Sequence, residues 1–590
     1  MKSFLKYTLA TITGIIISVF VLTILMFGIF GAIISSTDKP ASIKDNSILQ
    51  LKINQNIPDR SPENPFDFDF ISKTFRTKTG LNDILKNLDK AKTDPKIKGV
   101  FLDIGAATPG IATQEEIREA LEDFKSSGKF IIAYANAFLP QTSYYLATIA
   151  DSVFCNPVAY FDFRGLRSET MYYKGALDKI GVEMQIIRHG KFKSAVEPYF
   201  RKDMSEESRE QIMVYLESIW NKILTDISAS RNISIGTLNE IADGLIQNPE
   251  DALEAGMIDG LMYQDEINTL LREKSGISQN KKIRFVSSSE YAKVPAKHSS
   301  SKKGLAKSKI AVIYASGIIG IDRGVENSIG GPRFVKAIRN ARKDSNIKAI
   351  VLRVNSPGGS AMISEHIWRE VDLARKDKPV IGSMGNLAAS GGYYILAPAD
   401  TIIAHPVTLT GSIGVFGTIP NAEKLLNDKL GLTFDVAKTN ENSDFGSLHR
   451  PLRPHEKAYL QAGVEKTYQD FINHVSEGRN IPLSTVDSIG QGRVWSGVSA
   501  LENGLIDSFG GLTKAISIAA EMAKLDHYRI VEYPKLEDPL EMIMKNLYLE
   551  MQIPNLKKEL GTYYPIYESL LELTSSYKIQ ARLPFHLEVY

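Results

Sequence analysis

Disulfides, an excess of charge of one sign and a recognisable metal site are all missing from this sequence. Cys155 is the only cysteine among 590 residues, so no disulfide can form within the chain, and its apolar neighbours predict a small core residue. Lysine and arginine total 70 against 68 aspartates and glutamates, which argues against a nucleic-acid-binding surface. No cluster of metal ligands stands out, so we expect neither a metal nor another cofactor.

An uncharged run at the amino terminus is the first positive feature. The 27 residues of Thr8–Ile34 carry no charge, and a helix of roughly 20 apolar residues spans the hydrocarbon core of a membrane. Lys2 and Lys6 precede the run and no A-x-A-like cleavage site follows it. The pattern therefore predicts an uncleaved single-span anchor with a cytoplasmic amino terminus and residues 41–590 across the membrane. The alternative is a long cleaved signal peptide.

The chain also contains the same segment twice. The stretch AKTDPKIKGVFLDI (91–104) matches ARKDSNIKAIVLRV (341–354) at an offset of 250. Further on, SYYLATIADSVFCNPV (143–158) matches GYYILAPADTIIAHPV (392–407) at an offset of 249. Two matches in the same order, with a one-residue difference in offset, indicate an internal duplication.

Each copy alternates short apolar strands with amphipathic helices, which predicts α/β units with largely parallel sheets. In the second copy we expect strands at 309–320, 348–357, 378–385 and 400–406, helices at 334–344 and 364–376, and a further helix opening at Ser390. We divide the chain into an amino-terminal segment and anchor at 1–40, a first repeat at 41–291, a Lys- and Ser-rich linker at 292–309, a second repeat at 310–535 and a tail of unknown role at 536–590.

The two copies have lost different residues. Ser390, in the setting AASGG, corresponds to Gln141 in the first copy. Lys193, in the setting KSAVEP, corresponds to Ser443 in the second copy. Taken alone, Ser390 is typical of a helix N-cap and Lys193 of a surface lysine. The complementary losses instead predict one composite site per chain, built from the serine of one copy and the lysine of the other.

A serine in such a site needs a base to act as a nucleophile at neutral pH. None of the nine histidines lies in a recognisable triad setting, and no G-x-S-x-G elbow is present. A lysine can be the base if burial lowers its pKa from about 10.4 to near 7–8. Glu197 would oppose this if it shared the pocket of Lys193, and we expect Pro198 to end a short helix there and turn the chain away. Gly358 and Gly359 are typical of a turn, or alternatively of an oxyanion hole completed by Gly391.

Four motifs carry a family resemblance: VNSPGGS, SMGNLAASGGYYILAPAD, LTGSIGVFG and GKFKSAVEPYFRKDMS. They resemble the long, duplicated form of the bacterial signal peptide peptidase A (protease IV) family. The resemblance implies two tandem Clp-protease/crotonase-like α/β repeats after a transmembrane helix, and a Ser/Lys-dyad serine endopeptidase. It implies Ser390 as nucleophile, Lys193 as base, Ser412 as a support for the lysine, and Gly359 and Gly391 as oxyanion-hole donors. The choice of Gly359 over Gly358 depends on the register of the motif.

The resemblance further implies substrates that are apolar peptides, such as signal peptides remaining in the membrane, and assembly as a homotetramer. It implies a bacterial inner (cytoplasmic) membrane protein with its catalytic part on the periplasmic side. One alternative is a catalytically inactive membrane scaffold of the same fold, which the presence of both Ser390 and Lys193 disfavours. The other is a crotonase-like acyl-CoA enzyme, which the predicted membrane anchor disfavours.

Overall fold

The computed structural model describes residues 43–535 apart from gaps at 63–67, 70–73, 76–78, 107–108, 247, 296–305 and 321–327, together with parts of 4–21 and residues 580–582. In the run Thr8–Ile34, residues 10–18 are helical with exposed side chains, and residues 22–34 lie outside the described part. Among the described residues, no helix combines the length and the apolar character needed to cross a membrane. Most of the predicted linker and tail also lie outside the described residues.

The first repeat contains a six-stranded sheet in which every neighbouring pair of strands is parallel. Its order is β10 (Gly260–Leu261), β7 (Ser152–Cys155), β5 (Phe130–Ala135), β4 (Ile97–Ile104), β1 (Ser47–Ile53) and β11 (Phe285–Ser287). Helices that include α2 (Leu81–Thr93) and α3 (Ile111–Lys125) join these strands. The sequences of these strands are continuous apolar runs because both faces of a parallel sheet are covered. Cys155 is buried in this sheet, as predicted.

The second repeat contains the corresponding elements in the same order. Its sheet runs β21 (Val494–Ser496), β19 (Leu409–Gly411), β17 (Val380–Ala389), β15 (Ile347–Ser356), β12 (Lys309–Ser316) and β23 (Arg529–Tyr533), with β18 (Thr401–Ala404) also paired with β17, and β22 (Ser508–Phe509) paired with β18. Helices α12 (Gly331–Lys343) and α13 (Ala361–Asp377) follow the predicted positions. The predicted parallel α/β pattern is confirmed, but the helix expected to open at Ser390, α14 (Gly391–Tyr394), has only four residues.

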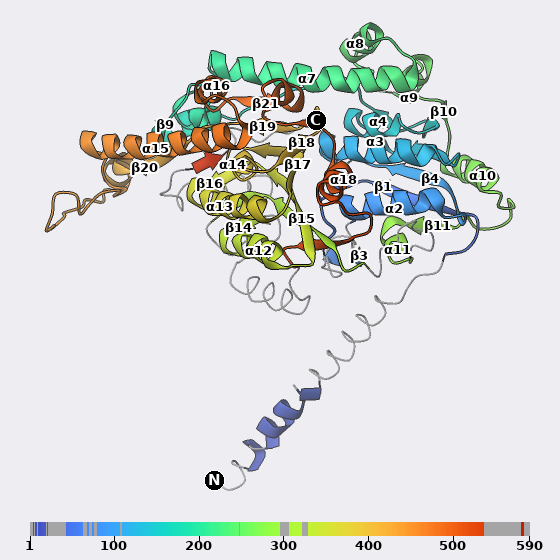
Figure 1. Ribbon diagram of the computed structural model, residues 1–590, viewed down its shortest axis with the longest axis horizontal. Coiled ribbons are helices and arrows are strands. Elements are labelled where there is room, and N and C mark those ends of the chain that lie inside the picture. Colours follow the sequence, from blue (N-terminus) through green and yellow to red (C-terminus); the bar gives the residue numbers. More distant parts are fainter. Residues whose placement is uncertain are drawn as a thin grey trace.

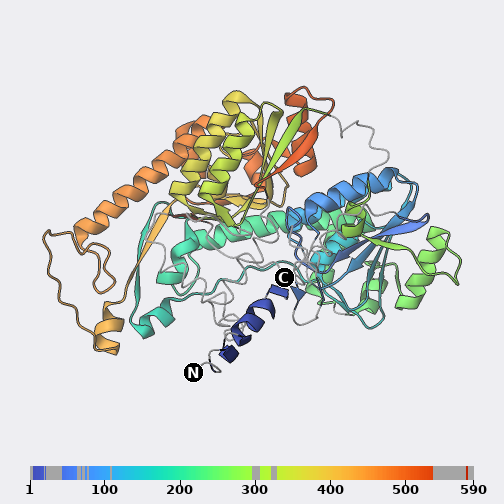
Figure 2. The same ribbon diagram turned by 90° about the horizontal axis from the view of Figure 1, so that it is seen from below.

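A third sheet joins the two repeats. Its order is β14 (Ser328–Gly330), β13 (Ile318–Gly320), β16 (Gly358–Ser360), β24 (Gln580–Arg582), β20 (Phe416–Asn421) and β9 (Glu183–Arg188). Strand β9 belongs to the first repeat and pairs antiparallel with β20 of the second. The long helix α7 (Glu206–Arg231) begins against the second repeat, where it contacts β21, and then returns to the first repeat (Figures 1 and 2). The first repeat therefore contributes two elements to the surroundings of the second.

A buried charged network also holds the repeats together. The guanidinium of Arg353, on β15, is fully buried and donates to Asp59 at 2.7 Å and to Glu116, on α3, at 2.5 Å. Beside it, His405 Nδ1 lies 3.3 Å from Glu115. Two carboxylates from the first repeat thus neutralise one arginine from the second. A buried pair of this kind is costly to break because the remaining charges have no water to solvate them.

We predict that Arg353→Leu lowers the free energy of unfolding by about 3–5 kcal/mol, because Asp59 and Glu116 are left buried without their counter-charge. Chemical denaturation followed by circular dichroism measures this change. The control is Arg369→Leu, which removes a half-exposed arginine paired with Asp372 and should cost less than about 1 kcal/mol. Equal denaturation midpoints for the two variants would show that the network does not stabilise the packing of the repeats.

Candidate active site

Ser390 lies on the sharp turn between β17 and α14. Its φ of 54° and ψ of −116° lie in a region that non-glycine residues rarely adopt, and such strain concentrates at functional sites. The backbone N–H donates to the Gly411 carbonyl at 2.8 Å. Although Ser390 precedes a helix, its hydroxyl makes no capping hydrogen bond, so the N-cap interpretation is wrong for the side chain. The neighbouring Gly392 has to be small, because a Cβ there would lie 2.7 Å from the Ser356 carbonyl oxygen.

Lys193 reaches this serine from the other repeat. Its Nζ lies 2.8 Å from Ser390 Oγ, 2.9 Å from Ser412 Oγ and 3.1 Å from the Ser412 carbonyl oxygen. The side chain is 0% exposed, so the surface-lysine alternative is wrong. Burial lowers the pKa of Lys193 well below its usual range, and none of its hydrogen-bond partners carries a charge that would raise it again. The structure therefore brings together the three side chains that the sequence singled out.

The path of the chain before Lys193 explains how it crosses between repeats. Strand β9 pairs with β20 up to Arg188, and the His189 N–H continues the pairing by donating to the Val415 carbonyl at 3.1 Å. The Phe192 N–H then donates to the Gln491 carbonyl at 3.1 Å. Backbone pairing with the second repeat thus guides the chain to the serine, and both residues of the pair belong to one chain.

Glu197 does not share the pocket of the lysine. Its carboxylate is buried but accepts hydrogen bonds from the Ser205 backbone N–H at 3.1 Å and from the Ser205 hydroxyl at 2.6 Å. The expectation for Pro198 is wrong, because Pro198 lies at the start of α6 (Glu197–Phe200) rather than at the end of a helix. The separation of carboxylate from amine comes from the bonds to Ser205, and it leaves Lys193 without an acidic partner.

The counterparts of the two site residues lie in surroundings unlike those of the site. Gln141, which corresponds to Ser390, begins α4 (Gln141–Ala147) and accepts from the backbone N–H groups of Arg164 at 2.9 Å and Gly165 at 2.8 Å. Ser443, which corresponds to Lys193, lies in the continuously exposed segment 427–443. This segment is part of an arm that extends away from the rest of the molecule (Figure 2). The complementary losses inferred from the sequence therefore have a structural basis.

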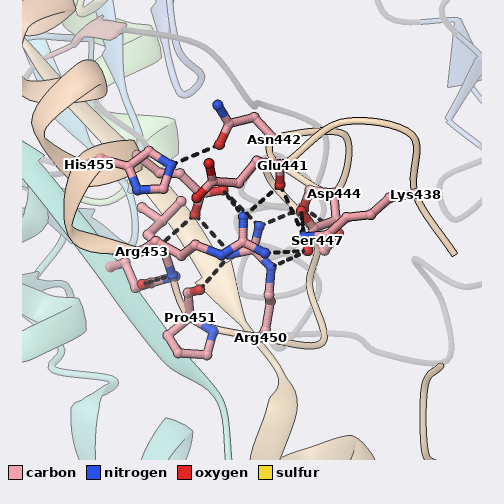
Figure 3. A network of polar contacts seen from close by, with 12 residues as sticks. Lys438, Glu441, Asn442, Asp444, Ser447, Arg450, Pro451, Arg453 and His455 are labelled. Carbon is pink, nitrogen blue, oxygen red and sulfur yellow. Dashed lines mark hydrogen bonds and ion pairs between the residues drawn. The ribbon is translucent and has the colours of Figure 1, made fainter. Parts of the chain in front are cut away.

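A polar network fastens the base of this arm (Figure 3). Arg450 and Arg453 both donate to Asp444 at 2.8 Å, and Arg450 also donates to Glu456 at 2.7 Å. The hydrogen bonds from Arg450 lower the pKa of Glu456 to about 2. The second repeat thus uses this segment to build an outward arm, whereas the first repeat uses its counterpart to deliver a lysine.

Two features of the site were missed by the sequence analysis. Gly492 has a φ of +82° and packs so closely on Lys193 that an added Cβ would lie 2.7 Å from the lysine Cα. Gln211, on α7, donates from Nε2 to the Phe192 carbonyl at 3.1 Å and to Ser194 Oγ at 2.9 Å, which holds the residues on both sides of Lys193. Neither residue lies near the site in sequence or in a motif with a recognisable chemical role, so no local signal pointed to them.

The two glycines of the pair, Gly358 and Gly359, make different contacts. Gly358 (φ 95°) donates its N–H to Ser356 Oγ at 3.1 Å. Gly359 (φ 152°) packs against β13 so closely that a Cβ would lie 2.2 Å from the Ile319 carbonyl oxygen. The first glycine N–H is thus used within the turn, which favours the second glycine as the donor to a bound ligand.

A serine on a strained turn, hydrogen-bonded to a buried lysine in a duplicated α/β fold, is the arrangement expected of a serine hydrolase. The comparisons with known proteins show that the chain is a serine protease. The model of Peptidase family S49 matches residues 123–278 and 372–526, one match in each repeat, and the chain belongs to this family. The two matches also confirm the internal duplication.

Full-length relatives show the same long, duplicated type. The chain is 37% identical over 482 residues to Protease 4 of Salmonella typhi, covering 79% of this chain and 76% of that protein. It is 34% identical over 476 residues to the chloroplastic serine protease SPPA of Arabidopsis thaliana, covering 80% and 70%. A ClpP1 variant from Listeria monocytogenes covers 35% of this chain and 94% of its own at 12% identity and a TM-score of only 0.24, so the Clp-protease/crotonase-like fold stays a prediction.

We predict that Gly492→Ala lowers peptidase activity at least about 100-fold, because the added methyl group displaces Lys193 and a shift of about 1 Å in a catalytic group has this effect. A fluorogenic apolar peptide measures the activity. The matched control is Gly446→Ala, which has a similar φ of +79° but no atom within 4 Å of the added Cβ, and should keep activity within about twofold. Equal activities would show that close packing on Lys193 is unimportant.

Proposed function

We propose that this protein is a membrane-anchored serine endopeptidase in which Ser390 and Lys193 form the catalytic dyad. The observation that carries the proposal is the 2.8 Å contact between Lys193 Nζ and Ser390 Oγ in a pocket where burial lowers the pKa of the lysine. A neutral amine at hydrogen-bond distance can accept the hydroxyl proton, which a protonated surface lysine cannot do. The inactive-scaffold alternative is disfavoured because Lys193 contacts both Ser390 and Ser412 at hydrogen-bond distance.

The reaction follows from this geometry. Lys193 takes the Ser390 proton while Oγ attacks the peptide carbonyl, and the backbone N–H groups of Gly359 and Gly391 stabilise the oxyanion. The protonated lysine then gives its proton to the leaving amine, which leaves an acyl group on the serine. Water, deprotonated by the neutral lysine, hydrolyses this ester and restores the hydroxyl. Ser412 positions the amine through its hydroxyl and its carbonyl oxygen.

For the substrate, we propose extended apolar peptides, including signal peptides that remain in the membrane. The motif resemblance supports this substrate class. The uncharged run Thr8–Ile34 supports a single-span anchor in the bacterial inner membrane, with the site on the periplasmic side. Assembly as a homotetramer is part of the same proposal and has the family resemblance as its support.

Ser390→Ala and Lys193→Ala should each abolish peptidase activity without unfolding the protein, since both remove atoms without adding any. The double variant should be no worse than either single variant, because the two groups act as a unit. Lys191→Ala is the control, since it removes an exposed lysine two residues from Lys193 and should leave the rate unchanged. Hydrolysis of the fluorogenic peptide and circular dichroism measure activity and folding, and a Lys193→Ala chain with normal activity would refute the dyad.

The pH dependence should follow the protonation of Lys193. Only the neutral amine is a base, so kcat/KM should rise about tenfold per pH unit at low pH and level off above the lowered pKa of the lysine. The midpoint should lie well below the usual range for lysine. Initial rates across buffers of constant ionic strength measure this profile. A midpoint at the ordinary lysine pKa would show that burial does not tune the base.

A further inference from the structure

A turn at residues 490–493 supports the segment that carries Lys193. The Gln491 carbonyl accepts a hydrogen bond from the Phe192 N–H at 3.1 Å, and Phe192 directly precedes the lysine. Gly492, the next residue of the turn, packs against the lysine itself, because an added Cβ would lie 2.7 Å from the Lys193 Cα. The position of the lysine backbone therefore depends on the position of this turn.

The same turn also supports Ser412, the second hydroxyl partner of the amine. The Ser412 N–H donates to the Arg493 carbonyl at 2.7 Å, and the Gly492 N–H donates to the Ile413 carbonyl at 2.8 Å. Ser412 has a φ of 49° and Gln491 a φ of 52°, in a region that is costly for residues with a Cβ. Backbone in such a conformation persists only where surrounding contacts hold it.

Tyr468 makes one such contact with the turn. It is buried on α15 (Pro454–Arg479), which packs beside β9 and β20 (Figure 1). Its hydroxyl accepts from the Gln491 N–H at 3.3 Å and donates to Oδ1 of Asp487, on α16 (Leu483–Ile489), at 2.6 Å. The Gln491 side-chain amide donates to the same carboxylate oxygen at 2.7 Å. Burial raises the pKa of Tyr468 above its usual range, so the hydroxyl remains a donor under ordinary assay conditions.

The ring of Tyr468 contacts the segment that leads to the lysine. It stacks on His189, with the ring centroids 3.7 Å apart and the ring planes inclined by 21°. His189 follows β9, and its N–H continues the pairing with the second repeat four residues before Lys193. The ring therefore supports the segment that carries the lysine, and the hydroxyl supports the turn against which the lysine packs.

We propose that Tyr468 is a positioning residue that fixes the Lys193 amine against Ser390 through the turn at 490–493. The proposal rests on the proposed Ser/Lys mechanism. Without the tyrosine hydroxyl, the strained turn loses a hydrogen bond at its left-handed residue and relaxes away from the lysine. An amine with more room is better hydrated, so its pKa returns toward the usual range and less of it is neutral near pH 7. Because the affected step is proton transfer, kcat falls while KM changes little.

The first test is the rate of Tyr468→Phe in the full chain, a change that removes one oxygen and keeps the ring that stacks on His189. We expect kcat for the fluorogenic peptide near pH 7 to fall at least about tenfold, with KM within about twofold of the parent. The matched control is Tyr144→Phe, which removes a similarly buried hydroxyl that donates to the Met257 carbonyl at 2.7 Å in the first repeat. It should keep kcat within about twofold of the parent. Equal kcat in the two variants, or a loss confined to KM, would overturn the proposal.

The pH profile separates positioning from a general loss of stability. The partners of the amine are uncharged, and charged groups on the surrounding elements have partners of their own: Arg493 with Glu210 at 2.7 Å, His189 with Glu465 at 2.5 Å, and Asp487 with Tyr468. Hydration of the amine should therefore raise the midpoint of kcat/KM in Tyr468→Phe by at least about 0.5 pH unit, so that the deficit shrinks as the pH rises. A merely structural defect lowers the amount of active enzyme and leaves the midpoint in place, and that result would overturn the proposal. Circular dichroism at each pH measures the folded fraction.

Hydrogen–deuterium exchange tests the same contacts without catalysis. In the Ser390→Ala background, the peptide that contains residues 190–193 should exchange faster in Tyr468→Phe than in the parent or in Tyr144→Phe, because the Phe192 N–H is bound to the turn. Unchanged exchange would overturn the proposal. If exchange responds but Ser390→Ala cleaves the peptide as fast as the parent, Tyr468 still holds the turn and the proposed endopeptidase function fails. If cleavage depends on Ser390 but neither kcat nor exchange responds to Tyr468→Phe, the positioning role alone fails.

Discussion

The burial of an uncompensated amine at Lys193 is the constraint on which the site depends. Burial lowers the pKa of this lysine, and its hydroxyl and carbonyl partners carry no charge to raise it again, so the neutral form that the proposed mechanism needs becomes easier to reach. The surroundings maintain this condition in three ways. Glu197 is bound to Ser205, Gly492 leaves room for the lysine backbone, and Gln211 holds the residues before and after the lysine.

Because the amine and the hydroxyl come from different repeats, the site exists only while the repeats are packed together. The pairing of β9 with β20 guides the lysine to the serine, and the Arg353 network holds α3 of the first repeat against β15 of the second. The redundant half-sites have become structural. Gln141 closes a turn with its side chain, and the arm that contains Ser443 is fixed by arginine–carboxylate bonds at its base. Chemistry and stability therefore depend on the same interface between repeats.

Much of this could be predicted from the sequence because duplication provides an internal comparison. Parallel strands such as β15 and β17 follow from their continuous apolar runs, and the pairing of Ser390 with Lys193 follows from what each copy lacks. Gly492 and Gln211 could not be predicted, because neither adjoins Ser390 or Lys193 in the chain and only the positions of β21, which follows Gly492, and of α7 in the fold bring them to the dyad. The short α14 and the position of Pro198 depend on local backbone geometry that residue patterns do not determine. No sequence pattern predicted that β24 pairs with β16 and β20, because residues 580–582 match neither a motif nor the alternation of a periodic strand.

The central claim is that neutral Lys193 activates Ser390, and phosphonylation by a fluorophosphonate probe tests it most directly. The probe reacts with an activated serine independently of any peptide preference, and peptide mass spectrometry identifies the labelled residue. We expect a single adduct on Ser390 in the full chain, and labelling at least about 100-fold slower in Lys193→Met, which keeps the volume of the side chain but removes the base. An adduct on another serine, or equal labelling rates in the two proteins, would contradict the account.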